Sequence, residues 1–251
     1  MTQYAMVIDL QKCVSCGACA LACKTENNTG LRRNGQTHNF CDFIYTTEGT
    51  FPELKHTTMP VQCNHCSNAP CVEACPVEPK AMFKTPEDLT MHNDERCIGC
   101  RACQDACPYS LDEVVDDNSY SVISYIDEDS PTHPFYHDGT EAIPGCTSSG
   151  LDTARAARTT PPDRTLFHHS DYEDVRRSNI TEKCYFCAHR LAEGQLPYCV
   201  ESCTARARRF GDISNPESEV SKLLKKYENF VLKPDEGTKP NVYYIRKYNT
   251  K

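Results

Sequence analysis

The chain has 251 residues, 39% of them apolar, no tryptophan and a formal net charge of -8 at neutral pH. This acidic balance argues against nucleic acid as a partner, because binding to a polyphosphate depends on clustered positive charge. The length allows one large domain or two small ones. Against this ordinary background, eighteen cysteines stand out.

The first predicted element is a short strand over residues 5–9, which leads into the first group of cysteines. Residues 1–10 have neither the basic nor the apolar region of a signal peptide. No apolar run approaches the roughly eighteen residues that a transmembrane helix needs. We therefore expect no direct membrane insertion, and a location either in the cytoplasm or outside it after export with a partner that carries the signal.

Sixteen of the eighteen cysteines form four tight runs. The first and third have the spacing C-x2-C-x2-C-x3-C, the second has one longer gap, and eleven residues split the fourth. Proline follows the second and third runs, at Pro76 and Pro108. The runs are Cys13, Cys16, Cys19 and Cys23; Cys63, Cys66, Cys71 and Cys75; Cys97, Cys100, Cys103 and Cys107; and Cys184, Cys187, Cys199 and Cys203.

This spacing, with proline after it, is the signature of bacterial ferredoxins. There, three thiolates of a run hold one 4Fe-4S cluster and the fourth ligates the other cluster of a pair. Small residues inside the runs, such as Gly17 and Gly99, let the backbone approach the cluster closely. Four runs therefore predict four 4Fe-4S clusters and a protein that transfers electrons.

Zinc and disulfides are the alternative uses of clustered cysteines. Structural zinc closes at four ligands, so a third cysteine two residues after a C-x2-C pair has no role there. Only the fourth run, taken alone, is compatible with zinc. Disulfide frameworks are typical of short secreted chains, and these cysteines lie too close together to pair without strain. A zinc-binding structural protein stays the alternative of a different class.

Further strands are predicted over residues 89–92, 120–126 and 242–248, which favours an α+β fold. The second and third runs lie close together and form a natural pair, so by elimination the first and fourth pair with each other. The expected architecture is two ferredoxin-like modules of short strands and helices around pairs of clusters. Residues 1–55 with 180–251 form one module, residues 56–126 form the other, and residues 127–179 form a loop-rich insertion.

The insertion is rich in proline, serine, aspartate and histidine and has no clear period. Loops of this length tend to be functional or covered by a partner, so partner contact and exposed decoration both stay open. After the last cysteine, a packing helix is expected with Asn215 as its N-cap and Pro216 in its first turn. Its apolar face would carry Val220, Leu223, Leu224 and Tyr227.

The other candidate residues give weaker signals. Cys41 is expected to be a small buried hydrophobe, and Cys146 lies in the insertion. His65 and His189 stand beside run cysteines, where they either donate to sulfur or are ordinary histidines. Basic residues next to the runs either offset cluster charge or form a solvated face: Lys12, Lys24, Arg96, Arg101, Lys183, Arg190, Arg206, Arg208 and Arg209. No catalytic residue is predicted, since no paired carboxylates or activated nucleophile stand out.

The order and spacing of all four runs, residues 208–212 and residues 232–246 (LKPDEGTKPNVYYIR) resemble one family. It comprises the four-cluster iron-sulfur subunits of molybdopterin oxidoreductases of the dimethyl-sulfoxide reductase family. Within it, the chain is most similar to the small subunits of arsenate reductase, catechol dehydroxylases and pyrogallol-phloroglucinol transhydroxylase. The last does not preserve all sixteen ligand positions, which favours an external electron supply here.

The resemblance implies an electron-transfer subunit that relays electrons through four 4Fe-4S clusters. The relay would run to or from a catalytic subunit with molybdenum or tungsten on molybdopterin, in a reductase or reductive dehydroxylase. At its other end would stand a quinone-linked membrane anchor or a soluble electron donor. The alternative is an iron-sulfur subunit of another redox complex, such as formate dehydrogenase or hydrogenase.

The resemblance also implies how the cysteines divide among the clusters, with the last cysteine of each run crossing to a neighbouring cluster. One departure is Thr204, which stands where the family has proline after the fourth run. The implied sets are Cys13, Cys16, Cys19 with Cys203; Cys184, Cys187, Cys199 with Cys23; Cys63, Cys66, Cys71 with Cys107; and Cys97, Cys100, Cys103 with Cys75.

Overall fold

The computed structural model describes residues 2–27, 29–30, 32, 35–110, 120–128, 139–141, 143–158 and 178–248. Short helices and four small sheets alternate along these residues, which is the α+β class that the sequence predicts. The elements are β1 (Tyr4–Asp9), α1 (Ala18–Asn27), β2 (Cys41–Thr50), β3 (Glu53–Gln62), α2 (Pro70–Glu73), β4 (Met82–Lys84), β5 (Thr90–His92), α3 (Ala102–Asp105), β6 (Ile123–Ile126), α4 (Gly150–Ala157), β7 (Ile180–Lys183), α5 (Ala188–Ala192), α6 (Tyr198–Glu201), β8 (Arg208–Asp212), α7 (Glu219–Lys226), β9 (Asn229–Phe230), a 3-10 turn (Pro234–Glu236) and β10 (Val242–Ile245).

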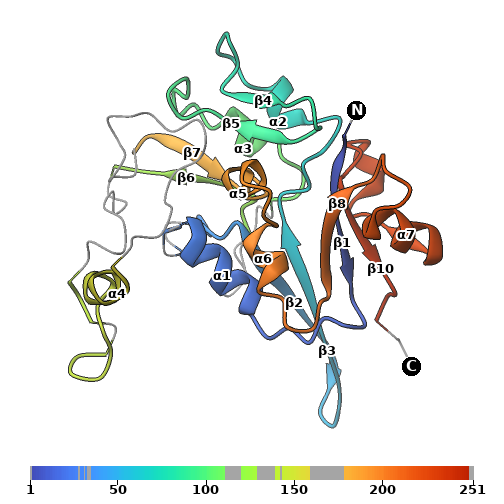
Figure 1. The fold of residues 1–251 in the computed structure, drawn as a ribbon, viewed down its shortest axis with the longest axis horizontal. Coiled ribbons are helices and arrows are strands. Elements are labelled where there is room, and N and C mark those ends of the chain that lie inside the picture. Colours follow the sequence, from blue (N-terminus) through green and yellow to red (C-terminus); the bar gives the residue numbers. More distant parts are fainter. Residues whose placement is uncertain are drawn as a thin grey trace.

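The two ends of the chain share the largest sheet, whose strand order is β8-β1-β10-β9. Strand β1 pairs parallel with β10, with Met6 opposite Val242, and antiparallel with β8, with Ile8 opposite Arg208. Its central side chains are fully buried, as expected of an apolar strand between two neighbours. Figure 1 shows these strands side by side, with α7 against them. The first run begins just after β1 and the fourth ends just before β8, so both runs lie at the same end of one sheet.

Three two-stranded hairpins complete the sheets: β2 with β3, β4 with β5, and β6 with β7. The long β2–β3 hairpin projects from the body of the molecule (Figure 1). In the β6–β7 hairpin Ile126 lies opposite Ile180, so the chain leaves for the insertion and returns from it at the same place. The described part of the insertion includes helix α4, capped by Ser149, so the loop-rich prediction misses this helix.

The predicted strands are found with changed bounds. Residues 5–9 and 89–92 correspond to β1 and β5. The predicted strand 120–126 narrows to β6, because Ser121 bonds instead with the side chain and backbone of Thr37. The predicted strand 242–248 narrows to β10, because Arg246 adopts a left-handed conformation with φ of 54°. The β2–β3 hairpin was not predicted from the sequence.

The prediction for the N-cap of the last helix is wrong. Helix α7 begins after Ser218, whose Oγ accepts a hydrogen bond from the Ser221 amide at 3.2 Å. Asn215 instead closes the preceding turn, where its Oδ1 accepts from the Glu217 amide at 2.9 Å. Val220 is fully buried with Val7 and Ile245, so the apolar face packs on the sheet as predicted.

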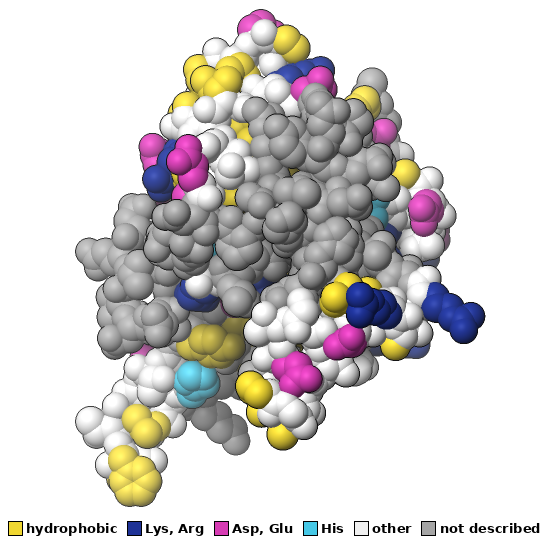
Figure 2. Space-filling view, turned by 90° about the vertical axis from the view of Figure 1, so that its left-hand side faces the viewer, with side chains coloured by type: hydrophobic (Ala, Val, Ile, Leu, Met, Phe, Trp, Pro, Cys, Tyr) yellow, Lys and Arg dark blue, Asp and Glu magenta, His cyan; other side chains and the backbone are white. Residues whose placement is uncertain are grey.

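Most of the run cysteines lie in the main core. Eleven of the sixteen run cysteines are buried, whereas Cys16 and Cys100 are exposed. Across the described residues, no helix combines the length and apolar character that crossing a bilayer requires. On the face in Figure 2, described acidic and basic side chains stand in the same neighbourhoods, so charges of opposite sign alternate there.

The cap geometry gives a stability prediction. Ser218→Ala removes the acceptor for the Ser221 amide and should cost about 1 kcal/mol. In a protein of this size that lowers the unfolding temperature by roughly 2–4 °C. Thermal unfolding of the cluster-loaded protein measures it, with Asn215→Ala as the control. An equal or larger drop for Asn215→Ala would contradict the cap assignment.

Candidate cluster-binding site

Each run is a loop that ends at a short helix. The helices α1, α2, α3 and α6 carry Cys19 and Cys23, Cys71, Cys103 and Cys199 respectively. One of these loops needs glycine because its backbone is left-handed where it packs against another segment. At Gly99, with φ of 69°, an added Cβ would come within 2.2 Å of the Asn179 carbonyl oxygen. The tight curvature of these loops follows from the short gaps between the cysteines of a run.

Backbone amides point at the cysteine sulfurs within these loops. The amide of Gly99 donates to Cys97 Sγ at 3.4 Å, and that of Phe186 to Cys184 Sγ at 3.4 Å. The amide of Ala207 donates to Cys203 Sγ at 3.2 Å. Such bonds stabilise a negative thiolate more than a neutral thiol, which suits sulfurs that ligate iron.

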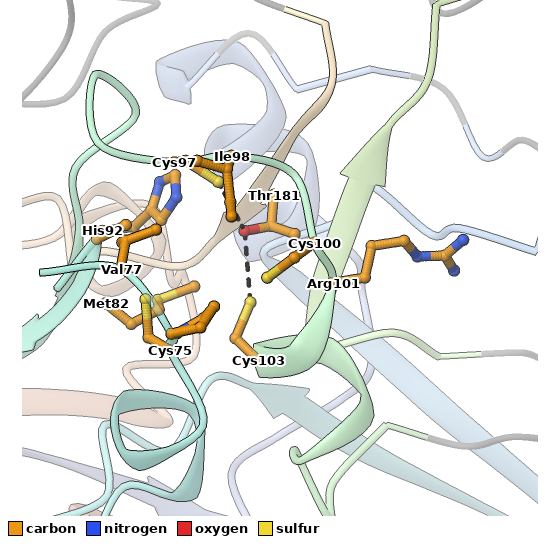
Figure 3. A pocket seen from close by; sticks show the side chains of 12 residues that line it. Cys75, Val77, Met82, His92, Cys97, Ile98, Cys100, Arg101, Cys103 and Thr181 are labelled. Atoms are coloured by element: carbon orange, nitrogen blue, oxygen red, sulfur yellow. Dashed lines mark hydrogen bonds between the residues drawn. The ribbon is translucent and has the colours of Figure 1, made fainter.

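The last cysteine of the second run lies with the first three of the third. Cys75, Cys97, Cys100 and Cys103 line one cavity, whose empty space of about 290 Å³ is partly open to solvent. Figure 3 shows these four side chains around the cavity, with Arg101 turned away from it. Burial raises the pKa of the Cys103 thiol to about 11, and the neighbouring cysteines add to the shift.

The last cysteine of the third run lies, in return, with the second. Burial, together with the nearby charges of Cys63 and Cys66, raises the pKa of Cys107 to about 12. Burial likewise raises the pKa of Cys66 to about 11, with Cys63 as the next cause. The last cysteine of each of these two runs therefore lies beside the other run.

Cys23, the last cysteine of the first run, lies among the fourth. Its pKa is raised well above the ordinary value, first by burial and then by the charges of Cys184, Cys199 and Cys187. Helices α1 and α6, which carry Cys19 and Cys199, contact each other and lie side by side in Figure 1. The remaining run cysteines, Cys13, Cys16 and Cys203, flank these two helices.

Several buried polar atoms beside the runs have no hydrogen-bond partner in the described residues. They include the side-chain nitrogens Nδ2 of Asn64, Nε2 of His65 and Nη2 of Arg208, together with the hydroxyls of Tyr120 and Ser202. Leaving such a donor unsatisfied costs about 1–3 kcal/mol. The sulfides of a 4Fe-4S cluster are acceptors, so these donors and the cysteine sets fit that cofactor.

The basic residues divide into two groups. Most are exposed or bonded to oxygen atoms away from the sulfurs: Arg190, for example, pairs with Glu26 and Glu201, and Arg209 with Glu219. Lys183 and Arg208 differ, since they are 0% and 2% exposed. Burial therefore favours a role in offsetting cluster charge for Lys183 and Arg208. For the exposed basic residues it favours an ordinary solvated surface.

The two histidines also differ. His189 Nε2 lies 2.7 Å from Glu26 Oε1, so this histidine bonds to a carboxylate and is an ordinary histidine, not a donor to sulfur. His65 is fully buried and stacks on Phe186, with ring centroids 3.8 Å apart. Its Nδ1 accepts from the Thr90 amide at 3.1 Å, and burial lowers its pKa well below the ordinary value. The neutral ring therefore carries its proton on Nε2 and can donate to a sulfur.

The cysteines outside the runs behave differently from each other. Cys41 is buried, as predicted, and its hydrogen bond lowers the pKa of Cys19 to about 5 against the opposing effect of burial. Cys146 is exposed. Sequence reasoning missed the contact of Thr181 with Cys103, at 3.5 Å between Oγ1 and Sγ, because no spacing rule links residues 78 positions apart.

No group of three or more His, Cys, Asp or Glu side chains within the described ranges is arranged to hold a single metal ion. A 4Fe-4S cluster instead places four irons between its ligands.

Comparison with known proteins agrees with this geometry. A family described as a 4Fe-4S dicluster domain matches residues 54–123 and 166–213, and a 4Fe-4S binding domain matches residues 4–25. These matches define a 4Fe-4S protein of the ferredoxin type.

Three relatives narrow the class. The iron-sulfur subunit of the arsenate respiratory reductase of Shewanella sp. (strain ANA-3) is 44% identical over 98% of this chain and 97% of its own length. A selenate reductase subunit of Mesobacillus selenatarsenatis is 33% identical over 97% of this chain and 72% of its own length. The iron-sulfur cluster-binding subunit of the menaquinone reductase of Nitratidesulfovibrio vulgaris is 31% identical over 98% of this chain and 89% of its own length.

The chain belongs to the family of ferredoxin-type iron-sulfur subunits of respiratory oxidoreductases. It is an electron-transfer subunit of a complex with a catalytic partner. Its cofactors are 4Fe-4S clusters, and sixteen run cysteines suffice for four of them.

Because the cysteines form much of the core, we expect the clusters to be part of the folded state. Removing iron with a chelator should abolish cooperative thermal unfolding, since the buried thiols and polar donors lose their partner. Circular dichroism during heating, before and after iron removal, measures this. An iron-free protein that unfolds cooperatively at the original temperature would contradict it.

Proposed function

We propose that this subunit carries electrons for a respiratory reductase whose catalytic subunit holds molybdenum or tungsten on molybdopterin. The observation that carries the proposal is the likeness to the arsenate and selenate reductase subunits over nearly the whole chain. The menaquinone reductase relative supports a quinone-linked anchor as the electron source. A soluble donor is the other option, and the complex would work in the cytoplasm or after co-export outside it.

We further propose two ferredoxin-like modules with the crossed ligand sets that the family resemblance implies. The pairing of β1 with β8 and β10 supports a module built from both ends of the chain. The proximity of Cys75 to the third run, of Cys107 to the second and of Cys23 to the fourth supports the crossing. Cys203 completes the set of Cys13, Cys16 and Cys19 in this scheme.

The same proximities give an order for the relay. Burial raises the pKa of Cys184, and the charge of Cys63 is the next cause, so the fourth-run set adjoins the second-run set. The four cluster sites then follow one another in this order: first the site that contains Cys97, then those that contain Cys63, Cys184 and Cys13. Cys100 and Cys16, which are exposed, belong to the two outer sets in this scheme, and this supports a relay with both ends near the surface.

Each bound 4Fe-4S cluster supplies one-electron chemistry. The chain positions and shields the clusters. Its cysteines fix the spacing between neighbouring cluster sites, and the buried core keeps water from the inner sites. Backbone amides such as that of Phe186 and buried donors such as His65 favour the more negative, reduced state of the site they face. No substrate chemistry is required of this subunit.

The composition of the purified complex tests the proposed partner. Anaerobic purification with its partner should give about sixteen irons per chain, as four complete clusters require. Molybdenum or tungsten should copurify in stoichiometric amount. Nickel in their place would favour a hydrogenase, and a colourless protein with zinc would refute the electron-transfer assignment.

Single substitutions test the crossed ligation. Cys23→Ser and Cys199→Ser lie in different runs but should remove or alter the same electron paramagnetic resonance (EPR) signal, because both ligate one cluster in this scheme. Cys13→Ser should affect a different signal. Cys146→Ser, at an exposed cysteine outside the runs, is the matched control and should keep all signals. If Cys23→Ser and Cys13→Ser affect the same signal while Cys199→Ser affects another, the crossing is wrong.

A further inference from the structure

Strand β7 and the residue that follows it adjoin three cysteine sets. Side chains two apart on a strand share a face, and Thr181 and Lys183 are such a pair. Thr181 Oγ1 lies 3.5 Å from Cys103 Sγ, as drawn in Figure 3. Lys183 Nζ lies 3.7 Å from Cys63 Sγ, and Cys184 follows directly in the chain. This strand therefore connects the third, second and fourth runs.

Lys183 is fully buried, and its amine is surrounded by acceptors. Nζ donates to the carbonyl oxygens of Thr90 and Cys184, the latter at 2.8 Å, and to the sulfur of Cys63. An ammonium has three N–H groups, whereas a neutral amine has two. Three acceptors therefore match the charged form of the side chain.

No carboxylate is among the partners of Lys183 in the described part of the chain. The aromatic ring of Tyr185, 5.5 Å from Nζ at its centroid, adds a weak attraction. A buried cation is costly unless an opposite charge compensates it. Two cysteine ligands feel this charge: Cys63 Sγ lies 3.7 Å from Nζ, and burial raises the pKa of Cys184, the next residue in the chain, while the charge of Lys183 opposes this rise.

We propose that Lys183 is a potential-setting residue at the junction of the two modules, acting on the cluster sites of both Cys63 and Cys184. This inference rests on the proposed function, which supplies the clusters at these sites. An added electron makes a site more negative, so a nearby ammonium favours the reduced state and raises the reduction potential.

The process that Lys183 assists is the passage of one electron between the two inner sites. One site is oxidised while the other is reduced, no bond forms or breaks, and the ammonium keeps its three protons. Because Lys183 stands between the sites, it raises both potentials and so changes the difference between them little. It is a positioning residue for charge and not a catalytic residue.

Potentiometric titration followed by EPR, on the complete complex with its catalytic subunit, tests the proposal. Lys183→Met keeps the length of the side chain but removes its charge. We expect two of the four cluster signals to become harder to reduce by at least tenfold in equilibrium constant, which is 59 mV for a one-electron couple. Lys183→Arg keeps the charge and should restore most of this shift.

Thr181→Val is the matched control on the same strand. It removes an uncharged donor facing Cys103. It should therefore shift a third signal and leave the two Lys183-dependent signals unchanged. A Lys183→Met complex with full iron content and unchanged midpoints would overturn the proposal, while the relay function would stand.

A measurement on the unmodified protein covers the case in which Lys183→Met does not assemble. With ¹⁵N-labelled lysine, pulsed EPR of the partly reduced complex should reveal a lysine nitrogen coupled to a cluster. A spectrum without such coupling would overturn the proposal. An iron count far below sixteen in the wild-type complex would instead refute the proposed function itself.

Discussion

The structure depends on bringing many cysteine sulfurs together inside a small core. Burial raises the pKa of Cys66 and Cys103 to about 11, and neighbouring thiolates oppose one another's ionisation. Clustered thiolates are therefore unfavourable until iron compensates their charge. Short helices, left-handed glycines and amides directed at sulfur are what this constraint demands of the backbone. The clusters act as part of the core and not as an addition to it.

The topology follows from the same demand. In the proposed ligation, a cysteine that crosses to a neighbouring site ties together segments that are far apart in sequence, so the backbone must hold them in register. The pairing of Ile8 with Arg208 and of Met6 with Val242 does this for the two ends of the chain. The return of the insertion at Ile180, opposite Ile126, delivers β7 to the inner sites.

The sequence predicts the runs, the α+β class and four of the ten strands in the described residues, because cysteine spacing and apolar periodicity are local properties. It does not separate Lys183 and Arg208 from seven other basic residues near the runs, since burial depends on which segments pack together. The histidines show the same limit: Glu26, 163 positions from His189, decides the role of that ring. The cap at Ser218 was missed for a simpler reason, as Asn215 three residues earlier offers an equally good local signal.

The two buried cations lie between cysteine sets and not within one set. Arg208 is held by Gln62 and Met6 and is close to Cys19 and Cys199, whereas Lys183 lies between Cys63 and Cys184. Coulomb attraction falls with distance, so each cation acts on the two sets it separates. The fourth-run set has a cation on both sides, while the third-run set faces the uncharged Thr181. We therefore expect the highest potential at the fourth-run site and a lower one at the third. An electron that enters at the exposed Cys100 end would then move downhill into the interior.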